Sequence, residues 1–376
     1  RQSIVLLKNE DKLLPLKKDI RTLAVIGPNA DNGYNMLGDY TAPQADGSVV
    51  TVLEGIRQKV SKDTRVLYAK GCAVRDSSRT GFADAIEAAR SADVVVMVVG
   101  GSSARDFSSE YEETGAAKVS ANRVSDMESG EGYDRATLHL MGRQLELLEE
   151  VRKLGKPMVL VLIKGRPLLM EGVIQEADAI LDAWYPGMQG GNAVADVLFG
   201  DYNPAGRLTL SVPRSVGQLP VYYNTKRKGN RSRYIEEAGT PRYPFGYGLS
   251  YTMFSYIGMK VRVSEESNHC RVDVSVTVRN QGTVDGDEVV QLYLRDEVGS
   301  FTTPDRQLRA FSRVRLKAGE TREITFTLDK KSLALYMRDG EWAVEPGRFT
   351  VMAGGSSEDI ACQQEFEINR KYTFKM

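Results

Sequence analysis

The sequence has 376 residues, of which 41% are hydrophobic and 27% are charged, as is typical of a globular protein large enough for two domains. Lys and Arg total 50, and Asp and Glu also total 50, so no net charge favours nucleic acid or an anionic membrane. The best apolar runs, residues 94–99 and 158–163, are far shorter than the roughly 20 residues that cross a bilayer. We therefore expect no nucleic-acid partner and no membrane partner.

The chain begins with Arg1 rather than Met and is already inside an apolar run at residues 4–7. This start indicates a cut or an internal boundary rather than a natural amino terminus. The absence of a signal peptide therefore says little, and composition leaves the localisation open.

Residues 22–211 alternate between short apolar strands and amphipathic helices. The strands lack the polar alternation of a half-exposed sheet, and the helices carry apolar residues every three to four positions. This alternation predicts an α/β fold, in which a mostly parallel sheet is sandwiched by helices and ligands bind at the carboxyl ends of the strands. The predicted strands are 23–26, 66–68, 94–99, 158–163 and 179–183, and the predicted helices are 82–90, 142–154 and 192–198.

A loop of about thirty residues follows the predicted strand 94–99. Most connections in compact domains are shorter than about 12–15 residues, so a loop of this length usually serves as a lid or a binding element. Most of its carboxylates are expected to be solvated. The eight are Asp106, Glu110, Glu112, Glu113, Asp126, Glu128, Glu131 and Asp134.

Glu131 differs from the other loop carboxylates because Gly130 and Gly132 flank it, which lets the backbone bring it close to a ligand. We predict a catalytic proton-transfer role for Glu131, and Glu128 and Asp134 are the next candidates for that role. Tyr133 and Arg135 stand beside it as orienting groups. The candidate substrate-binding residues are Arg105 and Tyr133.

Other motifs favour structural roles. Residues 25–31 follow a strand but lack Gly-x-Gly-x-x-Gly, so we favour a tight turn capped by Asn29 or Asp31 over a phosphate site. Neither His139 nor His269 follows a Gly-x-Ser-x-Gly elbow, so the sequence supports no Ser-His-Asp triad. Trp184 ends a buried strand, and packing is favoured over a sugar-stacking platform.

Three cysteines and two histidines give no zinc-ligand spacing, so we expect no metal and no cofactor. Cys270 and Cys362 fall near the two ends of the carboxyl-terminal segment. A disulfide between them stays open for an oxidising compartment, and two buried free thiols are the favoured interpretation.

Residues 213–256 are rich in Pro, Gly and Tyr and show little periodicity, which predicts a linker packed onto the first domain rather than a loose tether. From residue 257 onward the apolar period changes to two, in about seven short strands separated by turn signals. This pattern predicts an antiparallel sandwich of fibronectin type. The predicted domains are an α/β sandwich at 1–212, the packed linker at 213–256 and the all-β sandwich at 257–376.

An ordered set of motifs in this chain resembles the carboxyl-terminal part of family 3 glycoside hydrolases, the β-glucosidase and β-xylosidase group. Each motif alone is weak, and the ordered set is specific. The motifs are residues 3–9, 14–16, 25–31, 38–40, 129–133, 183–187, 190–191 and 198–208 in the first half, and 245–251, 289–293, 308–311 and 346–347 toward the end.

The resemblance implies a retaining, exo-acting β-glucosidase-like enzyme that acts on a β-linked oligosaccharide or glycoside. An amino-terminal barrel absent from this sequence would carry the nucleophilic aspartate, and Glu131, by motif match, would be the general acid/base. The isolated 376 residues are then expected to be inactive, because nothing forms the covalent intermediate. The resemblance also suggests a periplasmic or secreted location. The alternative is a non-catalytic carbohydrate-binding or scaffolding module.

Overall fold

The computed structural model describes residues 1–42, 44–45, 47–103, 113, 126–130, 134–226 and 234–375. The chain divides into two compact units, Arg1–Gly206 with Val212–Leu219 and Arg207–Ser211 with Pro220–Met376. Residues 213–219 of the predicted linker therefore belong to the first unit and residues 220–256 to the second.

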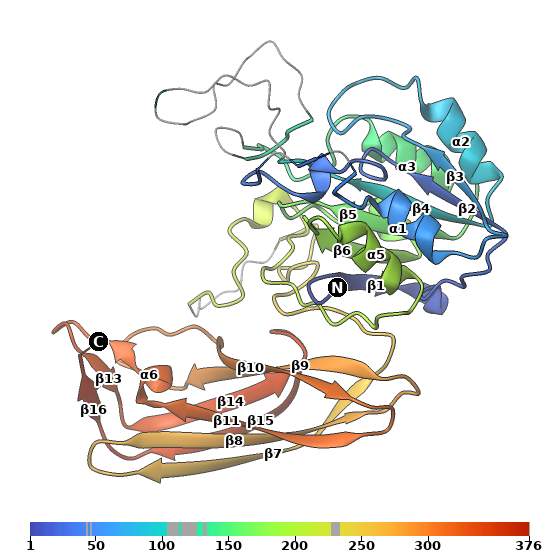
Figure 1. Ribbon diagram of the computed structural model, residues 1–376. Coiled ribbons are helices and arrows are strands. Elements are labelled where there is room, and N and C mark those ends of the chain that lie inside the picture. The colour runs from blue at the N-terminus through green and yellow to red at the C-terminus, as the bar shows by residue number, and fades with distance from the viewer. Residues whose placement is uncertain are drawn as a thin grey trace. The chain divides into compact units, whose positions relative to one another are not determined.

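The first unit is built on one six-stranded sheet with the strand order β1-β6-β5-β4-β2-β3 (Figure 1). β2 to β6 are parallel to one another, and β1 joins the edge antiparallel to β6. Every residue of the central strands β4 and β5 is buried, as expected for strands covered on both faces. The strands are β1 (Val5–Asn9), β2 (Thr22–Ile26), β3 (Arg65–Ala69), β4 (Val94–Gly100), β5 (Met158–Ile163) and β6 (Ala179–Trp184).

Helices cover both faces of this sheet, with α1 beside α5 on one face and α2 beside α3 on the other (Figure 1). The predicted α/β fold is therefore confirmed. The helices are α1 (Val52–Lys59), α2 (Phe82–Arg90), α3 (Gln144–Arg152), α4 (Val173–Glu176) and α5 (Gly190–Leu198), and the short 3-10 turns are η1 (Glu10–Lys12), η2 (Tyr34–Met36) and η3 (Val216–Gln218).

Three elements of this unit, β1, α1 and the four-residue α4, were not predicted from the pattern. Thr51 precedes α1 and closes its start with a capping box, in which the Thr51 side chain accepts from the Glu54 N–H and the Glu54 carboxylate accepts from the Thr51 N–H. β1 is recognisable as a strand only through its pairing with β6, because an apolar run of this length has no period of its own.

The second unit is all-β, and its described sheets are antiparallel. One sheet has the order β10-β9-β14-β15, a second has β11-β8-β7, and a small third sheet has β12-β13-β16. The predicted all-β sandwich is confirmed. The elements are β7 (Phe254–Glu265), β8 (Cys270–Asn280), β9 (Gly286–Asp296), β10 (Gln307–Leu316), β11 (Thr321–Asp329), α6 (Lys330–Leu333), β12 (Leu335–Tyr336), β13 (Trp342–Val344), β14 (Gly347–Gly354), β15 (Ile360–Ile368) and β16 (Tyr372–Phe374).

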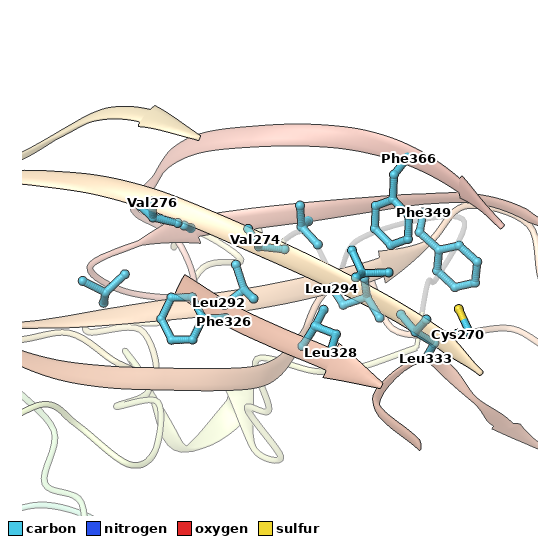
Figure 2. Close-up of a cluster of buried hydrophobic side chains, with 14 of the residues drawn as sticks. Cys270, Val274, Val276, Leu292, Leu294, Phe326, Leu328, Leu333, Phe349 and Phe366 are labelled. Carbon is cyan, nitrogen blue, oxygen red and sulfur yellow. The ribbon is translucent and has the colours of Figure 1, made fainter. Parts of the chain in front are cut away.

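The core of the second unit follows from the period of two along β8. Val274 and Val276 are fully buried, whereas the intervening Ser275 pairs at the surface with Thr325 of β11 at 3.0 Å. Figure 2 shows the inward valines of β8 facing apolar side chains of the other strands, including Leu292 and Leu294 of β9. The alternation seen in the sequence is therefore the alternation between core and solvent.

The aromatic segment after residue 220 packs on this sandwich. Tyr223 stacks on Phe245 with ring centroids 4.2 Å apart, and the buried Gln291 of β9 donates to the Gly246 carbonyl at 3.0 Å. Buried Glu288, also on β9, accepts from Arg207 and from the Tyr256 hydroxyl, each at 2.8 Å. The Tyr223–Phe245 stack and the bond from Gln291 to Gly246 hold the segment before β7 in place without a regular element.

Candidate functional site

Five parallel strands of the first unit, β2 to β6, end along one edge of the sheet, and the predicted catalytic loop leaves from the end of β4. Gly100, the last residue of β4, has φ +140°, and a Cβ there would lie 2.0 Å from the Ile163 carbonyl oxygen of β5. Only glycine fits this turn without moving the neighbouring strand. The chain therefore passes tightly over the end of β5 into Gly101, Ser102 and Ser103.

A buried chain of side-chain hydrogen bonds ties this edge to the loop after β2. The Asn29 amide donates to the Gly101 carbonyl at 3.1 Å, and its oxygen accepts from the Asn35 amide at 2.7 Å. Asn35 in turn accepts from the Ser102 hydroxyl at 2.6 Å. The turn at residues 25–31 thus has the structural role that we predicted, and Asn29 makes the hydrogen bonds that link it to Gly101 and Asn35. A fully satisfied buried network of this kind makes the edge rigid.

Glu128 returns the long loop to the same edge of the sheet. Its backbone N–H donates to the Ser102 carbonyl at 2.9 Å. Its carboxylate forms an ion pair with Arg135, with Oε2 and Nη1 2.7 Å apart and the two side chains 0% and 2% exposed. Burial raises the pKa of the Glu128 carboxyl, and the Arg135 charge opposes that rise. A carboxylate closed off in this way is unsuited to proton exchange with a substrate.

Asp134, the second alternative to Glu131, is exposed and paired. Its carboxylate lies 3.4 Å from Arg166 and accepts from the Arg135 backbone N–H at 2.8 Å. The bond from the Arg135 N–H and the Arg166 charge lower the pKa of Asp134. A lowered pKa makes Asp134 a poor general acid near neutral pH.

Glu131, Arg105 and Tyr133, the predicted site residues, lie outside the residues that the structure describes. The residue before Glu131 is described: a Cβ on Gly130 would lie 3.1 Å from the Asp39 carboxylate. Gly130 therefore stands beside the loop that follows β2. Tyr40, next to Asp39, is 85% exposed. The motif at residues 38–40 includes Tyr40, but the motif does not predict that the Tyr40 ring is exposed.

Tyr185 packs behind these residues. A Cβ on Gly38 would lie 3.1 Å from its ring, and one on Gly165 would lie 2.6 Å from it. Burial raises the pKa of Tyr185, and the Glu128 charge adds to the rise, so the phenol stays neutral at physiological pH. Tyr185 thus fills the space between the loops after β2 and β5.

Trp184, just before Tyr185, is engaged within its own unit. It has φ +56°, which is unusual for a bulky residue, and its indole N–H donates to the Ser3 carbonyl at 3.1 Å. Its ring lies 4.5 Å from the ammonium of Lys164, which is fully buried with Asp182 at 2.5 Å. These contacts are those of a packing residue.

The described residues contain no group of three or more side chains that could hold a metal ion. His139 lies 3.0 Å from Glu171, and both are about half exposed. Cys72, Cys270 and Cys362 are free thiols, of which the first two are buried. In the part of the chain that the structure describes, no helix has both the length and the apolar character required to cross a membrane.

Comparison with known proteins places both units in established domain types. Residues 4–251 match the glycosyl hydrolase family 3 C-terminal domain, and residues 288–357 match the fibronectin type III-like domain.

Relatives cover the chain nearly end to end. The chain is 41% identical over 367 residues to a β-xylosidase of Formosa agariphila, which covers 95% of this chain and 47% of the relative. It is 39% identical over 398 residues to a periplasmic β-glucosidase of Salmonella typhimurium, which covers 98% of this chain and 49% of the relative. The solved β-glucosidase of Listeria innocua in complex with glucose superposes with a TM-score of 0.82 at 33% identity, over 98% of this chain and 48% of that protein. The chain thus spans about half the length of the curated relatives that it matches.

Proposed function

This chain belongs to glycoside hydrolase family 3, and we propose that it is the carboxyl-terminal part of a retaining, exo-acting β-glycosidase of the β-glucosidase type, with Glu131 as the general acid/base. Its substrate class is a β-linked oligosaccharide or glycoside, as the names of the relatives suggest. An amino-terminal barrel supplies the nucleophile. We call this chain joined to that barrel the barrel-containing enzyme.

One observation carries the assignment of the proton donor. The two described carboxylates nearest to Glu131 in sequence are both unsuited to the task, because Glu128 is sealed in a buried ion pair and Asp134 has a lowered pKa. Glu131 directly follows Gly130, which lies at the carboxyl edge of the sheet, where ligands of α/β proteins bind.

In the proposed reaction, a carboxylate of the barrel attacks the anomeric carbon while the glycosidic C–O bond breaks. Glu131 gives its proton to the departing oxygen, and the sugar stays on the enzyme as a glycosyl ester. The Glu131 carboxylate then takes a proton from water as that water displaces the ester, which restores both carboxyl groups to their first state. The two carboxyls of a retaining enzyme lie about 5–5.5 Å apart, so Glu131 must reach the barrel's site.

Substitution of Glu131 by Ala in the barrel-containing enzyme tests this role. We expect kcat/KM to fall by about 10²–10⁴-fold for an alkyl glycoside, whose leaving group needs protonation, and far less for a 4-nitrophenyl glycoside. Azide should partly restore turnover of the nitrophenyl substrate and yield the β-glycosyl azide.

The matched control is Glu113→Ala, because Glu113 is an exposed carboxylate of the same loop. Its kcat/KM should match that of the wild type. An unimpaired Glu131→Ala enzyme would refute the assignment. The alternative, a non-catalytic carbohydrate-binding module, would then be tested by glycan-array binding of the chain alone. Hydrolysis of aryl glycosides by the purified 376-residue chain would contradict the need for the barrel.

A further inference from the structure

Glu128 and Arg135 bracket the predicted acid/base residue in sequence, three positions before it and four positions after it. Their side chains nevertheless meet, with Oε2 and Nη1 2.7 Å apart. One ion pair therefore joins the two residues that flank the segment 129–134.

Both members of this ion pair are also held at the ends of the segment by hydrogen bonds to neighbouring loops. At one end, the Glu128 N–H donates to the Ser102 carbonyl at 2.9 Å, and the Arg75 guanidinium donates to the Met127 carbonyl at 2.5 Å. At the other end, the Arg135 guanidinium donates to the His139 carbonyl. The ion pair thus joins two fixed points rather than two mobile side chains.

Burial makes this pair costly to open. Within the described residues, neither Glu128 oxygen has an aligned hydrogen-bond partner, and the same holds for Nε and Nη1 of Arg135. The Arg135 charge stabilises the Glu128 carboxylate most, ahead of the charges of Arg166 and Arg75. Separating the pair therefore leaves each buried charge without its main partner. The nearby His139–Glu171 pair is about half exposed and has no such penalty, because water replaces either partner.

We propose that the Glu128–Arg135 ion pair is a clamp that positions Glu131 for proton transfer, an inference that rests on the acid/base role proposed above. A general acid must be held within about 0.5 Å of its productive place, and a displacement of about 1 Å costs on the order of 100-fold in rate. The clamp supplies this restraint without adding net charge beside the proton donor, because the two charges cancel. Glu128 and Arg135 are positioning residues, not catalytic ones.

The test compares Glu128→Gln with Glu171→Gln in the barrel-containing enzyme. Both variants exchange a paired carboxylate for an amide, the first in the buried clamp and the second in the exposed pair. The measured quantity is kcat/KM for an alkyl glycoside divided by kcat/KM for the 4-nitrophenyl glycoside of the same sugar. Loss of folded protein lowers both values equally and leaves this ratio unchanged, whereas a misplaced general acid lowers the ratio.

We expect the ratio to fall by at least about tenfold in Glu128→Gln and to change less than about twofold in Glu171→Gln. If Glu128→Gln is insoluble, the neutral double variant Glu128→Gln/Arg135→Gln removes the unpaired charge and should show the same fall. A ratio within twofold of wild type in a folded clamp variant overturns the clamp, provided that Glu131→Ala lowers it. If Glu131→Ala also leaves the ratio unchanged, the acid/base assignment itself is wrong.

Discussion

The Glu128 carboxylate lies directly against the Cα of Gly101: a Cβ built on Gly101 would be 1.9 Å from Oε1 and 2.4 Å from Cδ. The Gly101 backbone has little room to retreat, because its N–H donates to the Ile163 carbonyl of β5 at 2.9 Å. The glycine after β4 therefore leaves the space in which the clamp carboxylate sits.

Gly101→Ala should consequently act through Glu128. We expect a loss of about 1–3 kcal/mol in unfolding free energy, as for other insertions of a methyl group into packed space, together with a fall in the alkyl-to-nitrophenyl ratio. Chemical denaturation of the chain and the two kcat/KM values of the barrel-containing enzyme measure these effects. The control is Gly217→Ala in the same unit, where the new methyl would lie 3.5 Å from its neighbour and should be tolerated. Equal behaviour of the two variants would contradict the role of Gly101.

The parallel sheet was predictable from the sequence because its strands are continuous apolar runs. The prediction at residues 158–163 coincides with β5, and those at 94–99 and 179–183 end one residue before β4 and β6 do. The second unit was predictable for the opposite reason, since the valines of β8 alternate with polar residues. In both units the spacing of apolar residues along the chain is enough to predict the strands.

The clamp was not predictable, because its formation depends on tertiary contacts. In the sequence, Glu128 is one of eight similar loop carboxylates, and Arg135 was interpreted as an orienting group for Glu131. Burial against Gly101 distinguishes Glu128 from the other loop carboxylates that the structure describes, and no pattern in the chain encodes that burial. The same holds for Lys164, a lysine that the apolar run 158–163 gives no reason to expect at 0% exposure.

Breaking the buried Lys164–Asp182 ion pair should lower the unfolding free energy strongly. Lys164→Met leaves Asp182 as an uncompensated charge at the end of β6, and we expect a loss of about 3–5 kcal/mol in unfolding free energy. The double variant Lys164→Met/Asp182→Leu removes both charges and should recover most of this loss. Urea titrations followed by Trp184 fluorescence, in a background where Trp342→Phe leaves one indole, report on this unit alone. A double variant as unstable as the single one would speak against ionic coupling.

Tyr40 has an exposed ring and follows Asp39, whose carboxylate lies near Gly130, the residue before the proposed proton donor. We expect this ring to contact the leaving group of a disaccharide. Covering about 50 Å² of ring face at about 25 cal/mol per Å² is worth about 1.3 kcal/mol, close to tenfold in affinity. Tyr40→Ala should therefore raise KM for a disaccharide by about tenfold and leave the melting temperature unchanged. Steady-state kinetics of the barrel-containing enzyme measure this.

Tyr222→Ala, an exposed tyrosine of the other unit, is the control for the Tyr40 substitution and should leave KM unchanged. If Tyr40→Ala has the wild-type KM for disaccharides, its ring lies outside the leaving-group site.

Asp201 should give the first unit a pH-dependent increment of stability. Its carboxylate accepts from Lys18 at 2.5 Å and from Lys59 at 2.7 Å, and these bonds lower the pKa of Asp201. A carboxyl whose pKa is lowered by folding binds fewer protons in the folded state than in the unfolded state. Its stabilisation is therefore complete above the unfolded pKa of about 3.9 and disappears as the pH falls through the lower folded value.

Asp201→Asn should thus lower stability at pH 7 by about 0.5–1 kcal/mol, or about 2 °C in melting temperature, and the difference from wild type should shrink as the pH falls below the unfolded pKa of about 3.9. Scanning calorimetry between pH 2.5 and 7 measures the difference, and 1 M NaCl should reduce it, because the screening length is then about 3 Å. Asp63→Asn, at an exposed carboxylate of the same unit, should show no such pH dependence. If the stability difference between wild type and Asp201→Asn does not change with pH, the amide perturbs packing, because only a titrating carboxylate loses its stabilising effect in acid.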